Sequence, residues 1–423
     1  MTVTPKPHIS AEGKAKLDAF LADKVAEKKI PAIFFGAANA DGEIYFNAQG
    51  DKVLGEPDKG QIDADTTVQL FSQTKFLTSL ACIQLWEKGL VDFDDAALIE
   101  KHLPELVSQK VLTGWEADGT PRLVDRVTPI TLRHLLTHTS GLSYGFLRPD
   151  LIGRWEMTNK VPGFLANNVG IEALTEPTIF EPGTKYAYGI GIDWAGVLVM
   201  RISGQKLGAY FDEHIFGPCG VSNISFYPTP EIKERLMQLC GRDETPERNL
   251  IHTTGFRDVP ALKPEDVGLH SGGAGLIGSP REYMTVLRHV LQCKDKDGVI
   301  KQSTFPLLFQ NAMPSRDEEG KSHTCYKDLG GLITLLGDNE PKFASGDKVF
   351  HSLALCVNDD DSEYGRKKGT AFWGGIAKTK YWIDPASGIV AVCGTQLMDA
   401  IDQTATANVW KAYERLLYDV LES

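Results

Sequence analysis

The stretch Ser72-Gln73-Thr74-Lys75 opens an apolar run that continues to Gly89. Apolar residues recur along this run at helical spacing, and glycine is frequent directly after a helix, so residues 72–89 are predicted to form a helix. Residues three apart share one helix face, which would bring the Lys75 amine within hydrogen-bond reach of the Ser72 hydroxyl. A serine hydroxyl alone is a weak nucleophile at neutral pH and needs such a neighbour. Ser72 is therefore a candidate nucleophile.

The S-x-x-K pattern is loose, and Ser203-Gly204-Gln205-Lys206 matches it as well. That second copy follows a predicted helix over Trp194–Ile202 and contains a glycine, which is typical of a helix exit. Ser72 instead stands at a helix start, where free backbone N–H groups and a positive dipole are available. Local context therefore favours Ser72 over Ser203.

A third serine, Ser143, lies in Gly141-Leu142-Ser143-Tyr144-Gly145, which matches G-x-S-x-G. That motif indicates a nucleophile only at a strand-to-helix elbow of a parallel α/β sheet. The preceding residues, Ile130–Thr139, are predicted to be helical, and no strand is predicted directly before Ser143. We therefore interpret Gly141–Gly145 as a loop.

Tyr188 lies directly before the largely apolar run Ile190–Met200. A phenol relays protons to a serine when nearby cations hold it as phenolate, which makes Tyr188 a candidate general base. A tyrosine ahead of a helix more often serves packing, so that reading stays open for Tyr188 taken alone.

The segment Trp373-Gly374-Gly375-Ile376 precedes a predicted strand over Lys380–Ile383. Paired glycines let a backbone approach a ligand closely. An N–H group in this segment would complete an oxyanion hole with the N–H of Ser72. A tight turn at a strand edge explains the two glycines equally well.

Strand-like runs lie near both ends of the chain, and the part between them is mostly helical. The predicted strands are Ala32–Ala38, Glu43–Ala48, Gly330–Leu336, Lys348–Val357, Lys380–Ile383 and Ile389–Thr395. Amphipathic helices are predicted over residues 11–29 and Gln403–Leu421. The alternating pattern of a doubly wound parallel sheet is absent.

This order predicts an α+β fold, with a central antiparallel sheet flanked by helices and an inserted, mostly helical lobe. We expect residues 1–92 and 300–423 to form a discontinuous α/β domain. Residues 93–299 are expected to form a mostly helical domain, with the active site at the interface of the two.

Composition excludes several classes of protein. Lys plus Arg total 44 against 56 acidic residues among 423, a formal charge of −12, which disfavours nucleic acid and anionic membranes as partners. No apolar run reaches the roughly 20 residues that span a bilayer, and the first residues lack an apolar signal core. The seven cysteines are scattered and never form C-x-x-C, which is typical of buried reduced thiols in a cytoplasmic protein.

Two further patterns have metal-capable residues. His134 and His138 are four apart but lack the Glu of a zinc protease motif and an obvious third ligand. Asn358-Asp359-Asp360-Asp361 lacks the spacing of an EF-hand loop, so a solvated hairpin loop is the better reading. We predict neither a metal nor a cofactor.

Three features, in their order along the chain, resemble the serine β-lactamase-like superfamily. They are the S-x-x-K pattern, the tyrosine and the glycine-containing strand segment. The pieces that carry the resemblance furthest are Ile130-Thr131-Leu132-Arg133-His134-Leu135-Leu136-Thr137-His138-Thr139-Ser140-Gly141-Leu142-Ser143-Tyr144, Tyr188-Gly189, Asp193-Trp194-Ala195-Gly196, Gly272-Gly273-Ala274-Gly275 and Trp373-Gly374-Gly375. They look like the family VIII carboxylesterases, which are of the class C β-lactamase type. They are closer still to the fungal acyltransferases that complete statin side chains. The resemblance covers about residues 25 to 400.

The resemblance implies a role for each matching residue. Ser72 would be the nucleophile, Lys75 its proton partner and Tyr188 the general base. The N–H groups of Ser72 and Ile376 would form the oxyanion hole. Substrate contacts are implied for Trp373, Gly374, Gly375 and Tyr144.

Two departures bear on the substrate. Penicillin-recognising members usually carry Y-x-N and K-T-G or H-T-G, where this chain has Tyr188-Gly189-Ile190 and Trp373-Gly374-Gly375. The cation that grips a β-lactam carboxylate is therefore missing from the motif, and we expect weak or absent β-lactamase activity. The resemblance implies acyl transfer or hydrolysis of small esters or thioesters through an acyl-Ser72 intermediate.

The expected partners are an ester or thioester donor, including an acyl carrier or carrier protein, and an alcohol acceptor. An alternative is a catalytically inactive binding or sensor protein of the same fold. Such members typically lose the serine, the lysine or the tyrosine, whereas this chain retains Ser72, Lys75 and Tyr188.

Overall fold

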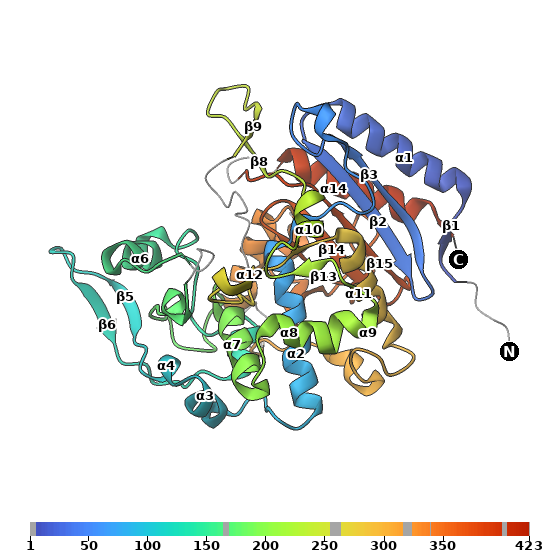
Figure 1. The fold of residues 1–423 in the computed structure, drawn as a ribbon. Helices are drawn as coiled ribbons and strands as arrows, with labels where there is room; N and C mark the ends of the chain where they lie inside the picture. The colour runs from blue at the N-terminus through green and yellow to red at the C-terminus, as the bar shows by residue number, and fades with distance from the viewer. Residues whose placement is uncertain are drawn as a thin grey trace.

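The computed structural model describes residues 6–163, 169–253, 264–315, 324–338, 340–399 and 404–422. Its centre is a seven-stranded antiparallel sheet with the strand order β11-β12-β13-β14-β15-β2-β3 (Figure 1). Two neighbouring strands come from the N-terminal part of the chain and five from the C-terminal part. The strands are β2 (Ala32–Asn39), β3 (Glu43–Gly50), β11 (Val349–His351), β12 (Cys356–Asn358), β13 (Ala371–Gly375), β14 (Thr379–Asp384) and β15 (Ile389–Gly394).

Helices cover both faces of this sheet. Phe35 of β2 stacks on Tyr413 of α14, with ring centroids 3.9 Å apart. The next residue, Gly36, faces the other way, where a Cβ would lie 3.0 Å from the sulfur of Met284 in α11. Because successive strand residues point to opposite faces, β2 is buried along its whole length. The covering helices include α1 (Ala11–Ala26) and α14 (Thr404–Asp419) on one face and α11 (Pro280–Gln292) on the other.

α2 (Thr74–Glu87) runs beneath the sheet, between β14 and α7 (Gly191–Ser203), as Figure 1 shows. Phe76 of α2 lies 6.1 Å from Tyr381 of β14, centroid to centroid. Nearly every residue of α2 is buried, because the sheet covers one side of the helix and the inserted helices cover the other. This places the start of α2 in the interior of the molecule.

The remaining helices are α3 (Ala96–His102), α4 (Pro104–Val107), α5 (Leu132–Leu136), α6 (Arg154–Asn159), α8 (Leu207–Phe211), α9 (Gly217–Cys219), α10 (Pro230–Glu234), α12 (Thr324–Leu335) and α13 (Pro341–Ala344). The remaining strands are β1 (His8–Ile9), β4 (Val68–Gln69), β5 (Val111–Trp115), β6 (Pro121–Val124), β7 (Ile224–Ser225), β8 (Cys240–Arg242), β9 (Leu250–His252), β10 (Ile277–Gly278) and β16 (Leu421–Glu422). They form small two- and three-stranded sheets.

The predicted α+β fold with a central antiparallel sheet is confirmed, and so are four of the six predicted strands. The strand predicted at Gly330–Leu336 is wrong, because these residues belong largely to α12. Leu329, Leu332 and Ile333 are buried at the i, i+3, i+4 spacing of a helix. A short apolar run does not by itself distinguish a strand from a buried helix.

The single strand predicted over Lys348–Val357 is also wrong, because the chain turns back within it. β11 and β12 form a hairpin in which His351 pairs with Cys356. At the turn, the Ser352 hydroxyl accepts the N–H groups of Ala354 and Leu355. The predicted closing helix is confirmed as α14, and its expected first residue, Gln403, lies outside the described residues.

All seven cysteines lie in described segments, and each is buried, as predicted, with no disulfide between them. Within the residues that the structure describes, no helix is both long and apolar enough to cross a membrane.

Candidate active site

Ser72 lies in a single 3-10 turn, Phe71–Gln73, that leads directly into α2. The preceding residue, Phe71, has a φ of +45°, a left-handed value that bulky side chains rarely adopt. Its side chain packs in a small apolar cluster with Leu239 and Ala377. Strained backbone of this kind persists where the surrounding packing holds it, and it concentrates at functional sites. The structure thus places Ser72 at the helix start that the sequence predicts.

Lys75 points back to Ser72 from one turn along. Its Nζ donates to Ser72 Oγ at 3.4 Å, to Tyr144 Oη at 2.8 Å and to the carbonyl of Gly273 at 2.8 Å. A lysine ammonium has three donors and no acceptor, so these neighbours use all three. Lys75 is 2% exposed. A protonated Lys75 therefore has an acceptor for each of its three N–H groups.

The carbonyl of Gly273 is itself held in place by Asp193 of α7. The N–H of Gly273 donates to Asp193 Oδ1 at 3.0 Å, and the Ser271 hydroxyl donates to the same oxygen at 2.6 Å. A Cβ on Gly273 would lie 2.3 Å from Asp193 Oδ2, so this close contact requires glycine. Burial raises the pKa of Asp193, while Lys75 and these two donors act in the opposite direction. The sequence places Asp193 in one of the segments that carry the resemblance, but no role was assigned from sequence to this single acid in an apolar helix.

Tyr188 lies against both Lys75 and Trp373. Lys75 Nζ is 4.5 Å from the centroid of the Tyr188 ring. The indole N–H of Trp373 donates to Tyr188 Oη at 3.3 Å, and the two rings are 5.4 Å apart. Gly189 allows this arrangement, because a Cβ there would lie 2.4 Å from the Cα of Ser143. The structure therefore brings together Lys75, Tyr188 and Trp373, as the sequence predicts.

Tyr144 occupies the other side of Lys75. Its ring is 5.3 Å from that of Tyr188, and its backbone N–H donates to the carbonyl of Tyr188 at 3.1 Å. Burial, with nearby Asp193 and Tyr188, raises the pKa of Tyr144 well above its usual value. Tyr144 is therefore a neutral phenol that accepts from Lys75. A substrate contact by Tyr144 stays a prediction.

The end of β13 lies beside the turn that holds Ser72. A Cβ on Gly375 would lie 2.7 Å from the carbonyl oxygen of Leu70, so glycine is required for this close approach. The N–H of Gly375 donates to Thr379 Oγ1 at 3.0 Å. Ile376 follows and packs on the cluster that contains Phe71. The predicted oxyanion segment is thus next to the predicted nucleophile.

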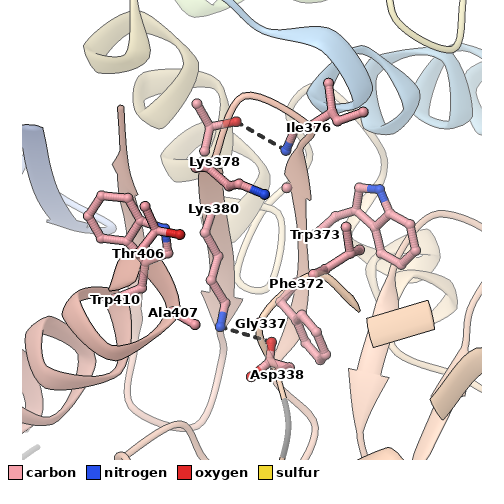
Figure 2. Close-up of a pocket in the computed structure, with 14 residues that line it drawn as sticks. Gly337, Asp338, Phe372, Trp373, Ile376, Lys378, Lys380, Thr406, Ala407 and Trp410 are labelled. Atoms are coloured by element: carbon pink, nitrogen blue, oxygen red, sulfur yellow. Dashed lines mark hydrogen bonds and ion pairs between the residues drawn. The ribbon is translucent and has the colours of Figure 1, made fainter. Parts of the chain in front are cut away.

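A small cavity of about 60 Å³ lies where β13 and β14 meet α14 (Figure 2). Lys380 lines it and is paired across the sheet with Gly374, one position along from Trp373. Its ammonium is engaged in the interior, 2.8 Å from Asp338 Oδ2. Trp373 points to the opposite face of the sheet, toward Tyr188. Lys380 therefore does not replace the missing Lys or His of K-T-G or H-T-G.

The two rival serines occupy other environments. Ser143 is buried in the loop after α5, and no strand directly precedes it. Ser203 ends α7, where Gly204 adopts a left-handed conformation and the Ser203 hydroxyl donates to the carbonyl of Val199 at 2.7 Å. The loop and helix-exit interpretations of these serines are confirmed.

His134 lies in α5 and His138 lies just after it, and each is held by hydrogen bonds or packing within the protein. His134 completes a capping box with Thr131 at the start of the helix. His138 packs among aromatic rings, 4.8 Å from that of Tyr188. In the described part of the chain, no group of three or more His, Cys, Asp or Glu side chains is placed to hold a metal ion.

A serine at a helix start, a lysine three residues on and a tyrosine beside them define the class of serine acyl-transfer enzymes with the β-lactamase fold. A family model described as Beta-lactamase matches residues 17–414, and the chain belongs to that family.

The relatives agree with the class. Monacolin J acid methylbutanoyltransferase from Aspergillus terreus is 30% identical over 404 residues, 93% of this chain and 93% of that protein. Lovastatin esterase from Penicillium rubens is 29% identical over 394 residues, 92% of this chain and 94% of that protein. The solved structure of simvastatin synthase from Aspergillus terreus matches with a TM-score of 0.81 and 28% identity, over 97% of this chain and 98% of that one. The chain is an acyl-transfer enzyme of the β-lactamase family.

Proposed function

We propose that Ser72 is the nucleophile and that the enzyme transfers acyl groups from small esters or thioesters. One observation carries this proposal. The Lys75 ammonium lies 3.4 Å from Ser72 Oγ and 4.5 Å from the centre of the Tyr188 ring. A single buried cation therefore stabilises negative charge on either oxygen as a proton passes between them.

In the proposed first step, Tyr188 acts as phenolate and takes the proton of the Ser72 hydroxyl while Oγ bonds to the acyl carbon. The resulting oxyanion collapses, the bond to the leaving group breaks, and Tyr188 returns the proton to the leaving group. In the second step an alcohol or water loses its proton to Tyr188 and attacks the acyl-Ser72 ester. The tetrahedral intermediate then collapses, the bond between the acyl carbon and Ser72 Oγ breaks, and Tyr188 returns the proton to Oγ. Lys75 stays an ammonium throughout.

The oxyanion hole in this proposal consists of the N–H groups of Ser72 and Ile376. The N–H of Gly375 is already donated to Thr379, so the next amide in the chain is the better candidate. The close approach of Gly375 to Leu70 brings this amide to the turn that carries Ser72. Two such donors stabilise a tetrahedral intermediate by several kcal/mol, of order 3 kcal/mol each.

The substrate is proposed to contact Trp373, Gly374, Gly375 and Tyr144. Aromatic rings dominate these surroundings, which favours an apolar acyl group or alcohol. The ammonium of Lys380 is held by Asp338, so a β-lactam carboxylate would find no partner there. We therefore propose neutral esters or thioesters rather than β-lactams as substrates.

Ser72 and Trp373 belong to the segments that contain the sheet and its flanking α2, whereas Tyr144 and Tyr188 belong to the inserted part. We propose that these parts are the two domains, residues 1–92 with 300–423 and residues 93–299. The relatives include both a transferase and an esterase. We propose acyl transfer from an ester or carrier-bound thioester to an alcohol, with hydrolysis as the competing outcome.

A p-nitrophenyl ester series of increasing chain length, with and without added alcohols, tests this proposal. Release of p-nitrophenol reports acylation, and mass spectrometry of the products separates new esters from free acids. We expect new esters with at least one alcohol. If alcohols never form esters, the transferase assignment fails and the hydrolase assignment stands. Efficient hydrolysis of a cephalosporin, run in parallel, would contradict the assignment of the substrate.

A further inference from the structure

His138 has a backbone conformation that is unusual for a residue with a side chain. It follows α5 with a φ of +57°, a left-handed value that histidine tolerates better than most residues with a side chain. Its carbonyl accepts the N–H of Ala187 at 2.9 Å, directly before Tyr188. His138 is 2% exposed. Its backbone therefore fixes the peptide that leads into Tyr188.

The imidazole of His138 contacts Tyr188 itself. Its ring centroid lies 4.8 Å from that of Tyr188, at an interplanar angle of 60°. It lies 6.4 Å from Trp373, which donates to the Tyr188 hydroxyl, and 5.6 Å from His351. Tyr188 is thus enclosed by His138 and Trp373, with Lys75 over its ring.

The imidazole of His138 acts on Tyr188 by packing against its ring. Its Nδ1 is buried and has no hydrogen-bond partner among the described residues. Burial, with His351 and Lys75 nearby, lowers the pKa of His138 well below its usual value, so the ring is neutral. Burial lowers the pKa of His351 to about 4, so His351 contributes a second neutral ring, whose Nδ1 lies 2.6 Å from the Ser352 carbonyl and carries the proton.

We propose that His138 is a positioning residue for Tyr188, whose neutral ring holds the phenol beside Lys75 and Ser72. This inference rests on the proposed role of Tyr188 as the general base. A base that is displaced by about 1 Å loses on the order of 10²-fold in rate without a change in substrate binding. The effect of losing the ring should therefore appear in kcat rather than in KM.

His138→Asn tests this directly, because asparagine accepts the left-handed conformation and keeps the backbone carbonyl but removes the ring. His138→Phe restores an aromatic ring without nitrogen, and exposed His252→Asn is the matched control. Kinetics with p-nitrophenyl butyrate are normalised to active sites by end-point titration with a fluorophosphonate. We expect kcat per titrated site to fall about tenfold or more in His138→Asn, with KM within about twofold. We expect His138→Phe to recover most of the loss and His252→Asn to match wild type.

A purely structural role would lower the number of titrated sites but leave kcat per site unchanged, and that result would overturn the proposal. So would a His138→Phe enzyme no faster than His138→Asn. If His138→Asn yields no folded protein, His138→Gln carries the same test. Tyr188→Phe distinguishes failure of the proposed function from failure of this inference. An unchanged kcat in Tyr188→Phe would refute the role of Tyr188 as the general base. A large loss in Tyr188→Phe with normal kinetics in His138→Asn refutes only the role of His138.

Discussion

Lys75 has three N–H groups, and the fold supplies three acceptors from three separate parts of the chain. Two of them, Tyr144 and Gly273, lie at 2.8 Å, and Ser72 lies at 3.4 Å. The two shorter bonds anchor the ammonium, while the longer one leaves Ser72 Oγ free to move toward a substrate. In the proposed mechanism Lys75 therefore supplies charge at a fixed place, and Tyr188 is the group that moves the proton.

Replacement of Lys75 by methionine keeps the volume of the side chain and removes the charge. We expect kcat/KM for p-nitrophenyl butyrate to fall by about 10³-fold, because both proton transfer and charge stabilisation are lost. Lys88→Met, at the exposed end of the same helix, should stay within about twofold of wild type. Loss of less than about tenfold in Lys75→Met would show that the ammonium is not needed.

Glu176 is a buried acid close to this site. Burial, with a hydrogen bond and the charge of Glu156, raises the pKa of Glu176 to about 9. The folded state therefore holds a proton that the unfolded state releases near pH 4.5. The stability from this group is fully present below about pH 4.5 and is lost as the pH rises through about 9.

We expect Glu176→Gln to remove this dependence on pH. The variant should match wild type in free energy of unfolding at pH 4.5 and exceed it at pH 9 by several kcal/mol, on the order of 5 kcal/mol for a pKa raised from 4.5 to about 9. Urea unfolding at both pH values measures this, with exposed Glu100→Gln as the control. A constant difference between Glu176→Gln and wild type across this range would contradict the assigned pKa.

At the scale of elements, local sequence patterns correctly predicted the features that depend on residues close together in the chain. Ser72 with Lys75 follows from helix periodicity, and β14 and β15 follow from short apolar runs. α12 was mistaken for a strand because its buried residues pack against α13 and β11, and a short apolar run does not by itself distinguish a strand from a buried helix. The roles of Asp193 and His138 depend on residues brought together only by the fold, so no spacing revealed them.

The contact between the end of β13 and the turn that holds Ser72 can be tested by substitution. Gly375→Ala places a Cβ 2.7 Å from the Leu70 carbonyl and must push the strand end away from Ser72. We expect kcat to fall by about 10- to 10³-fold, the range for loss of an oxyanion donor. Gly331→Ala is the control, because its Cβ meets nothing within 4 Å and helix propensity should raise stability by roughly 1 kcal/mol. An active Gly375→Ala enzyme would remove Ile376 from the oxyanion hole.

At the scale of the molecule, a buried ion network joins β14, α14, the segment after α12 and the loop between β12 and β13. Arg366 donates to Asp338 at 2.7 Å and to Glu414 at 2.9 Å, and Lys380 lies 2.8 Å from Asp338. Burial alone would raise the pKa of Asp338, but Arg366 and Lys380 lower it to about 2. Its contribution to stability is therefore present above pH 3.8 and is lost as the pH falls through about 2.

Arg366→Met should destabilise the whole molecule, because the buried carboxylates of Asp338 and Glu414 lose their guanidinium partner and are left to share Lys380, at 2.8 and 3.9 Å. We expect a loss of about 3–5 kcal/mol in free energy of unfolding at neutral pH. Arg133→Met removes a more exposed pair with Asp94 and should cost under about 1 kcal/mol. Equal losses in the two variants, measured by urea unfolding, would contradict the importance of the network.

The proposed mechanism depends on an acyl group carried by Ser72. Intact-protein mass spectrometry after brief reaction with p-nitrophenyl butyrate, followed by peptide mapping, measures this directly. We predict a mass increase of one butyryl group, mapped to Ser72, in wild type, Ser143→Ala and Ser203→Ala, and none in Ser72→Ala. A butyryl group on any other residue, or equal labelling of Ser72→Ala and wild type, would contradict the account.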